Sequence, residues 1–198
     1  MLTFLITDFY NFEKRYVRFL CSRKKKSQNS EIKILKENGA SGFVIGCLKK
    51  DRTIDFEQTA RLVDAARQSD NKCAITFHRA FDIAVMPSVS DTLKQLVAIG
   101  CDALLTSGCH KNVTEGKQNL ESMQKIIDSE NLNIKLLIGG GVNSNVITDF
   151  LQTTRITNFH GSFSTKTHAE DPNQIFSFLG LNYLSNLEAI QKSASQKN

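Results

Sequence analysis

The chain has 198 residues, a formal net charge of +5, 40% apolar and 23% charged residues, five cysteines and no tryptophan. This length favours one domain, or two small ones, with enough chain to bury a core, and the ordinary composition excludes a disordered or fibrous protein. No apolar run approaches the roughly 18 residues that a membrane span requires.

The first thirty residues carry the whole net charge. Residues 1–30 hold seven Lys or Arg and two acidic side chains, and the rest of the chain is balanced. The run Arg23–Lys26 fits nuclear import or nucleic-acid binding, but no aromatic platform or recognition motif accompanies it, so a solvated basic stretch is favoured. The apolar opening Met1–Ile6 is short and meets Asp8, which argues against a signal peptide.

The five cysteines are widely spaced and form no Cys-x-x-Cys pair. This argues against a disulfide framework or a zinc finger and favours a reducing, cytoplasmic setting, with the nucleus as an alternative. Cys73 and Cys101 open apolar runs and are predicted to be buried. Cys47 and Cys109 follow strand-like runs, where a functional thiol can lie.

From residue 31 the chain alternates short apolar runs with amphipathic stretches. The apolar runs predict parallel strands over 43–45, 74–77, 103–106, 135–138 and 156–159, with a further strand over 2–6. The amphipathic stretches predict helices over 56–66, 89–97, 120–127 and 146–151, and the end of an earlier helix over 31–38. Asp55 and Ser144 are the expected N-caps, and Gly100 closes the second helix. Units of about 30 residues predict right-handed βαβ crossovers and therefore an α/β fold.

Polar residues follow every one of these strands. Because parallel strands end on the same side, these residues are expected to converge on one rim, which favours a closed TIM-type (β/α)₈ barrel over an open doubly wound sheet. His78 and Arg79 can polarise or protonate an oxyanion, and Asp82 can orient the imidazole or act as a base. The alternative is a strand-end histidine bonded to backbone, beside an ordinary Arg79–Asp82 ion pair.

Glycine loops supply the other candidate ligand-binding residues. Gly139, Gly140 and Gly141 offer backbone amides to an anion, although a tight turn before a helix explains them equally well. His160 adds a second candidate acid or base to the rim. The remaining expected ligand-binding residues are Ser107, Gly108, Gly161 and Ser162.

Taken together, these runs resemble the CutC copper-homeostasis family. The matching stretches are 38–44, 76–82, 105–108, 139–142 and 159–162, in family order and with family-like gaps. The resemblance covers about residues 31–170. It implies a TIM barrel, a cytosolic setting and a part in copper handling, with Cu(I) as the suspected bound ion and no assigned enzymatic activity.

The chain departs from the family pattern in two places. Family members carry an early Cys-bearing strand and an Arg-Pro-Arg-Gly-Gly-Asp-Phe-like run before the matched part, and only Asp8–Tyr10 faintly resembles the latter. The first two or three βα units are therefore expected to be missing, and a truncated isoform or mispredicted first exon is favoured over a genuinely shortened protein. Phe163–Thr165 also stands where the family usually carries an arginine.

The sequence offers few candidate ligands for copper. Cu(I) prefers two or three converging thiolates, and the candidate ligands Cys109 and Cys47 follow strands that are not adjacent. The resemblance implies that the family's ligand cysteines lie mainly in the missing part. This chain is therefore expected to bind copper poorly.

Three functions stay open at this stage. The first is a CutC-like cytosolic protein of copper homeostasis, which can form a homo-oligomer and does not bind membranes. The second is a barrel lyase, isomerase or hydrolase on a small phosphate- or carboxylate-bearing substrate, held by Arg79 and the loops at Gly139 and Gly161, with His78 or His160 as acid or base. The third is a non-functional fragment or a partner-dependent module.

Composition also predicts how the chain is divided. Residues 1–30 are assigned to a divergent basic segment and residues 31–185 to the barrel domain. Residues 186–198, rich in Ser, Lys and Gln, are assigned to a polar flexible tail.

Overall fold

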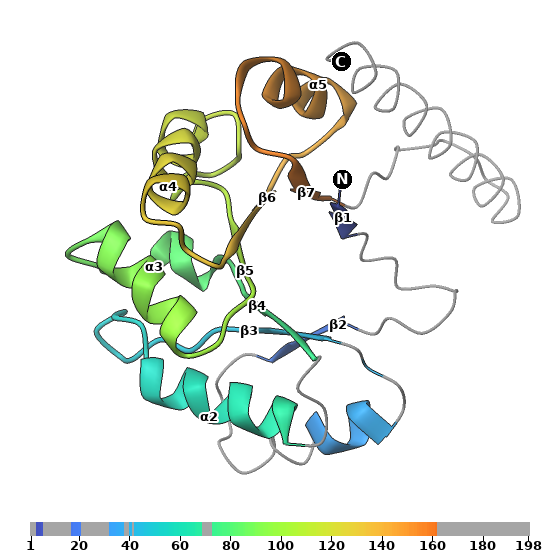
Figure 1. Cartoon of the computed structure of the whole chain (residues 1–198), viewed down its shortest axis with the longest axis vertical. Helices are drawn as coiled ribbons and strands as arrows, with labels where there is room; N and C mark the ends of the chain where they lie inside the picture. Colours follow the sequence, from blue (N-terminus) through green and yellow to red (C-terminus); the bar gives the residue numbers. More distant parts are fainter. Residues whose placement is uncertain are drawn as a thin grey trace, which may run out of the picture.

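The computed structural model (Figure 1) describes residues 32–37, 40, 42–68 and 73–161, and the backbone of two strands nearer the N-terminus. Its seven strands form one parallel sheet in the order β1-β7-β6-β5-β4-β3-β2. The strands are β1 (Thr3–Leu5), β2 (Val17–Leu20), β3 (Gly42–Ile45), β4 (Ala74–Phe77), β5 (Ala103–Thr106), β6 (Lys135–Gly139) and β7 (Asn158–His160).

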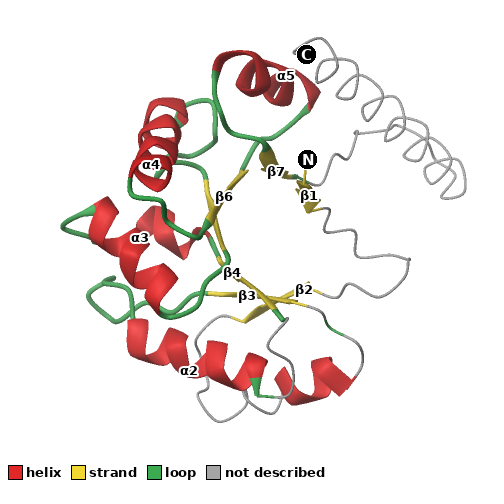
Figure 2. Cartoon of the chain, viewed as in Figure 1, coloured by secondary structure: helices red, strands yellow, loops and turns green. Residues whose placement is uncertain are grey.

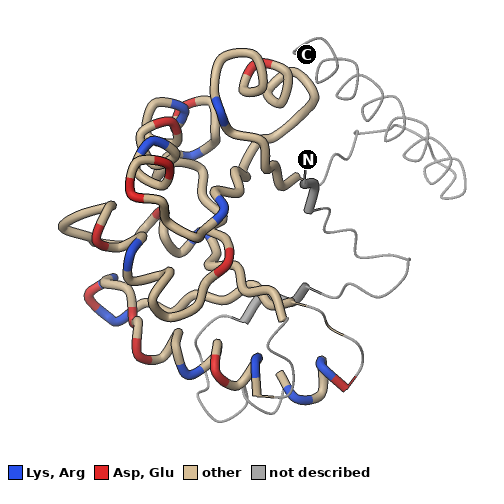
Figure 3. Tube along the Cα trace, in the orientation of Figure 1, with Lys and Arg blue, Asp and Glu red and all other residues tan. Residues whose placement is uncertain are grey.

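The strands form a curved sheet, and the helices lie on its outer side (Figure 2). Basic and acidic residues are interspersed along these outer helices (Figure 3), as expected for the charge-balanced part of the sequence. Among the described residues, no helix combines the length and the apolar character that crossing a membrane requires. The helices are α2 (Phe56–Arg67), the 3₁₀ helix η1 (Arg79–Ile83), α3 (Val89–Ala98), α4 (Lys117–Ser129) and α5 (Ser144–Thr153).

The predicted α/β fold of an incomplete TIM-type barrel is confirmed. The five strands and four helices expected after residue 42 form within a few residues of their predicted limits, and the expected strand over 2–6 is β1. Strand β2 was not predicted, because its four residues stand among basic side chains and show no clear apolar period. In the described sheet, β1 and β2 are the two edge strands.

The core lies between the sheet and the helices. Strand residues such as Phe43, Ile75 and Leu104 are buried, and they pack in one cluster with the apolar faces of the helices, which supply Leu62, Leu93, Leu96, Leu120, Ile147 and Phe150. Burial of both strand faces explains why these strands read as continuous apolar runs. Cys73 and Cys101 are buried in the same cluster, as predicted.

Side-chain caps fix where α2 and α5 begin. The Asp55 carboxylate accepts a hydrogen bond from the Gln58 amide at 3.0 Å, as predicted for the start of α2. The Ser144 cap was wrong: Asn143 caps α5, and its side-chain oxygen accepts from the Val146 amide at 3.0 Å. The two neighbouring residues are both good caps, and the tertiary structure begins the helix one residue earlier than expected.

A close backbone approach holds the loop after β5 against the start of α4. A Cβ atom at Gly116 would lie 1.9 Å from the carbonyl oxygen of Ser107, and one at Gly108 would lie 2.5 Å from the carbonyl oxygen of Gly116. The side-chain amide of Asn119 also donates to the carbonyl of Gly108 at 2.9 Å. The two carbonyl oxygens that the added Cβ atoms would meet belong to the backbone, so no side-chain movement can relieve the overlap.

We expect Gly116→Ala to destabilise the protein by about 2–3 kcal/mol, because overpacking a buried contact forces the backbone to move. Urea unfolding of the full chain measures this change. The matched control is Gln118→Ala, two residues further on and exposed, which should change stability by less than about 0.5 kcal/mol. Equal unfolding midpoints for Gly116→Ala and the wild type would contradict the proposed contact.

Candidate functional site

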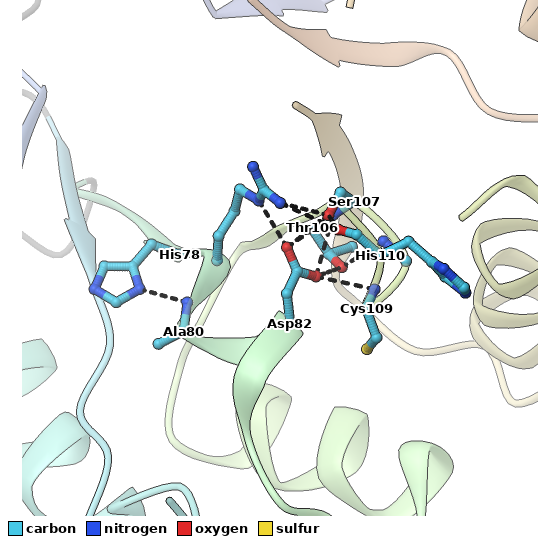
Figure 4. Close-up of polar contacts among 9 residues, drawn as sticks. His78, Ala80, Asp82, Thr106, Ser107, Cys109 and His110 are labelled. Atoms are coloured by element: carbon cyan, nitrogen blue, oxygen red, sulfur yellow. Dashed lines mark hydrogen bonds and ion pairs between the residues drawn. The ribbon is translucent and has the colours of Figure 1, made fainter. Parts of the chain in front are cut away.

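The predicted rim residues lie at the carboxyl ends of β4, β5, β6 and β7, where the loops that follow the strands meet. Figure 4 shows Asp82 at the centre of a polar network with Thr106, Ser107 and Cys109, while His78 points away from it. The last predicted rim residue, Ser162, lies outside the described residues, as do Cys21, the basic run 23–26 and the tail.

Asp82 is a buried carboxylate whose oxygens are surrounded by donors. Its side chain is 5% exposed. Oδ1 accepts from the Thr106 hydroxyl and from the amides of Ser107 at 3.1 Å and Cys109 at 3.2 Å. Oδ2 accepts from Arg79 Nε at 2.7 Å and from the Ser107 amide at 3.1 Å, with the Ser107 hydroxyl at 2.9 Å. A carboxylate bound in this way positions its neighbours.

Arg79 is held in place by these contacts. Its Nη2 donates to the Ser107 hydroxyl at 2.6 Å and to the carbonyl of His110 at 3.3 Å, in addition to the Nε bond to Asp82. Among the described residues, no acceptor pairs with its Nη1. The side chain is 40% exposed, so one nitrogen of a fixed guanidinium remains available at the rim.

The glycine loop after β6 lies against the same guanidinium. Gly140 has φ +116°, and a Cβ atom there would lie 2.8 Å from Arg79 Nη1. Gly141 also has a positive φ, +75°, and the carbonyl of Gly140 accepts from the Val113 amide at 3.0 Å. The run is therefore more than a tight turn before α5, because it lets Arg79 approach the backbone of a neighbouring loop.

An open depression of about 630 Å³ lies beside this network. Arg79 and Lys111 bring positive charge to it, and among the described residues the only acidic side chain in its lining is Asp82, whose oxygens are already engaged. The described residues that line it are Arg79, Asp82, Ile83, Cys109, His110 and Lys111. Arginine in a fixed geometry is the side chain best suited to carboxylate and phosphate groups, so the arrangement can bind a small anion.

His78 has a structural environment. Its Nδ1 accepts from the Ala80 amide at 3.0 Å and so caps η1, and its ring lies against Gly46. Burial lowers the pKa of His78 below its ordinary value, which favours the neutral ring that this acceptor role requires. Of the alternatives from the sequence, the backbone-bonded histidine agrees with these contacts.

His160 and Gly139 pair across the sheet. They are register partners in β6 and β7, and a Cβ atom at Gly139 would lie 3.2 Å from the His160 ring. His160 and Gly161 are both half-buried. His160 ends β7 and Gly161 follows it, and β6 lies between β7 and β5.

The two candidate copper ligands are separated by a strand. Cys47 follows β3 and is buried in the core, Cys109 follows β5 and is exposed, and β4 lies between these strands. Burial and, secondarily, the charge of Asp82 raise the pKa of the Cys109 thiol, which disfavours the thiolate that Cu(I) prefers. Within the described residues, no three His, Cys, Asp or Glu side chains are grouped to hold a metal ion.

Thr106 and Lys111 are site residues that the sequence reasoning missed. Thr106 is the polar last residue of an otherwise apolar strand, and its hydroxyl donates to Asp82. That polar ending was a usable signal for a partner at the rim. Lys111 gave no such signal, because an isolated lysine in a loop is typical of any soluble surface.

A curved parallel sheet with helices outside and a polar rim at its carboxyl ends defines a TIM-barrel-type α/β protein. The sequence model described as the CutC family matches residues 18–165. The chain therefore belongs to the CutC family, as its motifs predicted.

Curated relatives agree with this assignment. The family protein CutC of Histophilus somni is 34% identical over 140 residues, which cover 71% of this chain and 54% of the relative. The family protein CutC of Bacteroides fragilis is 32% identical over 165 residues, which cover 82% of this chain and 62% of the relative. The chain thus spans little more than half the length of these relatives.

Solved structures support the fold. The crystal structure of CutC from Streptococcus agalactiae, whose name refers to copper homeostasis, matches with a TM-score of 0.62 and 24% identity, covering 71% of this chain and 65% of that one. The 3-keto-L-gulonate-6-phosphate decarboxylase of Vibrio cholerae matches with a TM-score of 0.50 and 12% identity, covering 90% of this chain and 72% of that one. At these identities the likeness concerns the architecture alone.

We expect Asp82→Asn to destabilise the protein by about 3 kcal/mol, because the change removes a buried charge partner of Arg79 and turns an amide donor toward backbone donors. Chemical denaturation measures the loss. Asp149→Asn is the matched control: Asp149 pairs with Lys117 at 2.6 Å near the surface, where an ion pair contributes less than about 1 kcal/mol. If the two variants are equally stable, Asp82 does not organise the rim.

We expect the stability of the protein to fall as the pH decreases below the ordinary His78 pKa of 6.5. The unfolded chain binds a proton there, whereas the folded chain binds it only at lower pH, so stability rises with pH across this window and is unaffected above it. Urea midpoints between pH 7 and pH 5.5 measure the effect.

The variant that tests this assignment is His78→Asn, which keeps an acceptor for the Ala80 amide and does not titrate. It should reduce the loss of stability on acidification. The exposed His110→Asn should leave the pH dependence as it is in the wild type. An unchanged slope in His78→Asn would show that other groups cause the pH dependence.

Proposed function

We propose that this protein acts in copper homeostasis in the cytosol, as its family membership indicates, and that its rim binds a small phosphate- or carboxylate-bearing ligand at Arg79. The observation that carries the second part is the fixed guanidinium, which keeps Nη1 available after Nε and Nη2 have been engaged. The wide spacing of the five cysteines supports the cytosolic setting.

The fixed position of Arg79 favours anion binding over an ordinary ion pair. An exposed arginine loses side-chain entropy when it binds a ligand, but here the contacts with Asp82 and Ser107 have already restricted the side chain. The neighbouring Lys111 adds a positive charge to the same depression. An anion at Nη1 therefore meets a preorganised donor, and preorganisation is what converts contacts into affinity.

The described residues do not fit a Cu(I) site. Cys47 is enclosed by the core, the Cys109 thiol is disfavoured as a thiolate, and the described part of the chain offers no group of three potential ligands. We therefore propose no copper ligands among these residues. The role in copper homeostasis that we propose operates through the rim ligand, and a bound copper ion stays a prediction of the family resemblance.

We expect Arg79→Gln to weaken the binding of inorganic phosphate to the full chain by at least about tenfold, because a hydrogen bond to a charged group contributes roughly 1.5–3 kcal/mol. Glutamine retains an amide that can donate to Asp82, which limits damage to the fold. Isothermal titration or NMR titration measures the affinity.

The control for this experiment is Arg61→Gln, which removes a surface arginine that pairs with Glu57 on α2. It changes the net charge by the same amount and should leave phosphate binding near the wild-type value. Phosphate that binds equally well to both variants and to the wild type would refute the assignment of the anion site to Arg79.

A further inference from the structure

Two large apolar side chains are exposed beside the anion-binding depression. In the described part of the chain, the exposed large hydrophobic residues are Ile34, Ile83 and Val85, with exposures of 57%, 62% and 49%. Two of these three lie two residues apart in the segment that carries Arg79 and Asp82. Single exposed apolar residues need no explanation, but a pair next to a charged ligand site does.

The exposure of Ile83 does not arise from a loosely attached segment. Phe81, two residues earlier in η1, is fully buried in the core, and the Ala84 amide donates to its carbonyl at 3.2 Å. On the far side, the Val85 amide donates to the carbonyl of Arg52 at 3.0 Å. The backbone is therefore fixed before and after Ile83, and the fold presents this side chain outward.

Ile83 and Val85 each line a hollow in the surface. Ile83 lines the depression that contains Arg79 and Lys111. Val85 lines a second hollow of about 430 Å³, whose apolar residues include Ile54, Phe56, Val85, Met86 and Pro87. Basic side chains and exposed aliphatic carbon therefore line the same depression, and Val85, two residues further on, borders a second hollow.

We propose that the rim ligand is an amphiphilic anion: a small molecule whose carboxylate or phosphate group binds Arg79 Nη1 and Lys111, and whose aliphatic or aromatic part covers Ile83 and Val85. This inference rests on the proposed anion site and adds the chemical class of its ligand. Charge complementarity selects the acidic group, and the exposed Ile83 in the lining of the same depression gives the apolar part a place next to it. A purely inorganic anion would leave the aliphatic surface exposed.

The test is a titration of the full chain with the straight-chain carboxylates acetate, butyrate and hexanoate, followed by NMR. Affinity should rise along the series by about three- to fourfold for each methylene group that becomes buried, as expected from apolar transfer. Hexanoate should therefore bind at least about tenfold more tightly than acetate. Neutral 1-hexanol should bind more weakly than hexanoate, because it lacks the acidic group.

The variant Ile83→Ser should reduce the gain in affinity from acetate to hexanoate. Ile34→Ser is the matched control: it removes a similarly exposed isoleucine from the helical residues 32–37 and should leave the series unchanged. Both substitutions are at exposed positions, where effects on folding are small. A gain that is equal in Ile83→Ser and the wild type would overturn the inference.

The other outcomes separate this inference from the function on which it rests. Binding of acetate and phosphate without any gain for hexanoate would overturn the inference and leave the anion site intact. Absence of all anion binding would overturn the proposed function itself. Hexanol binding as tight as hexanoate binding, or a dimer that Ile83→Ser converts to a monomer in analytical ultracentrifugation, would overturn the amphiphilic anion as the occupant.

Discussion

The rim of this protein depends on the burial of one carboxylate. Asp82 is nearly inaccessible to solvent, and a charge in such a place is tolerated only when hydrogen bonds and an opposite charge replace its water. The amides of the loop after β5, the Thr106 hydroxyl and the Arg79 guanidinium supply these partners. Because those partners come from β5, its loop and η1, satisfying Asp82 fixes three parts of the rim relative to one another.

The burial of Asp82 separates the residues that hold their neighbours in position from those that can bind a ligand. Asp82 and Ser107 have their polar atoms engaged within the protein, and His78 caps η1. Among the described residues, no acceptor pairs with Nη1 of Arg79, whereas its Nε and Nη2 are engaged. These contacts support the anion-binding rim that we propose, and they differ from the thiolate site that Cu(I) prefers. For this member of the CutC family we propose a small-molecule ligand at the rim.

The strands and helices were predictable where their burial leaves a regular pattern of apolar residues in the sequence. Strands such as Phe43–Ile45 are covered on both faces and read as apolar runs, and the helices show one apolar face because only one side packs on the sheet. Strand β2 escaped prediction because its residues alternate poorly and stand in a basic segment. The choice of Asn143 over Ser144 as a cap escaped it because both residue types are suitable.

The sequence by itself determined the parallel α/β class, the family and the set of polar residues that follow the strands, because each of these depends on residue types at short or regular spacing. Only the tertiary structure decided their roles. Arg79 and Ser107 are 28 residues apart and in contact, while His78 lies next to Arg79 in sequence and faces Gly46 and Ala80. Packing between distant segments decides which groups are buried, which form hydrogen bonds and which stay available to a ligand. No local sequence pattern records these outcomes.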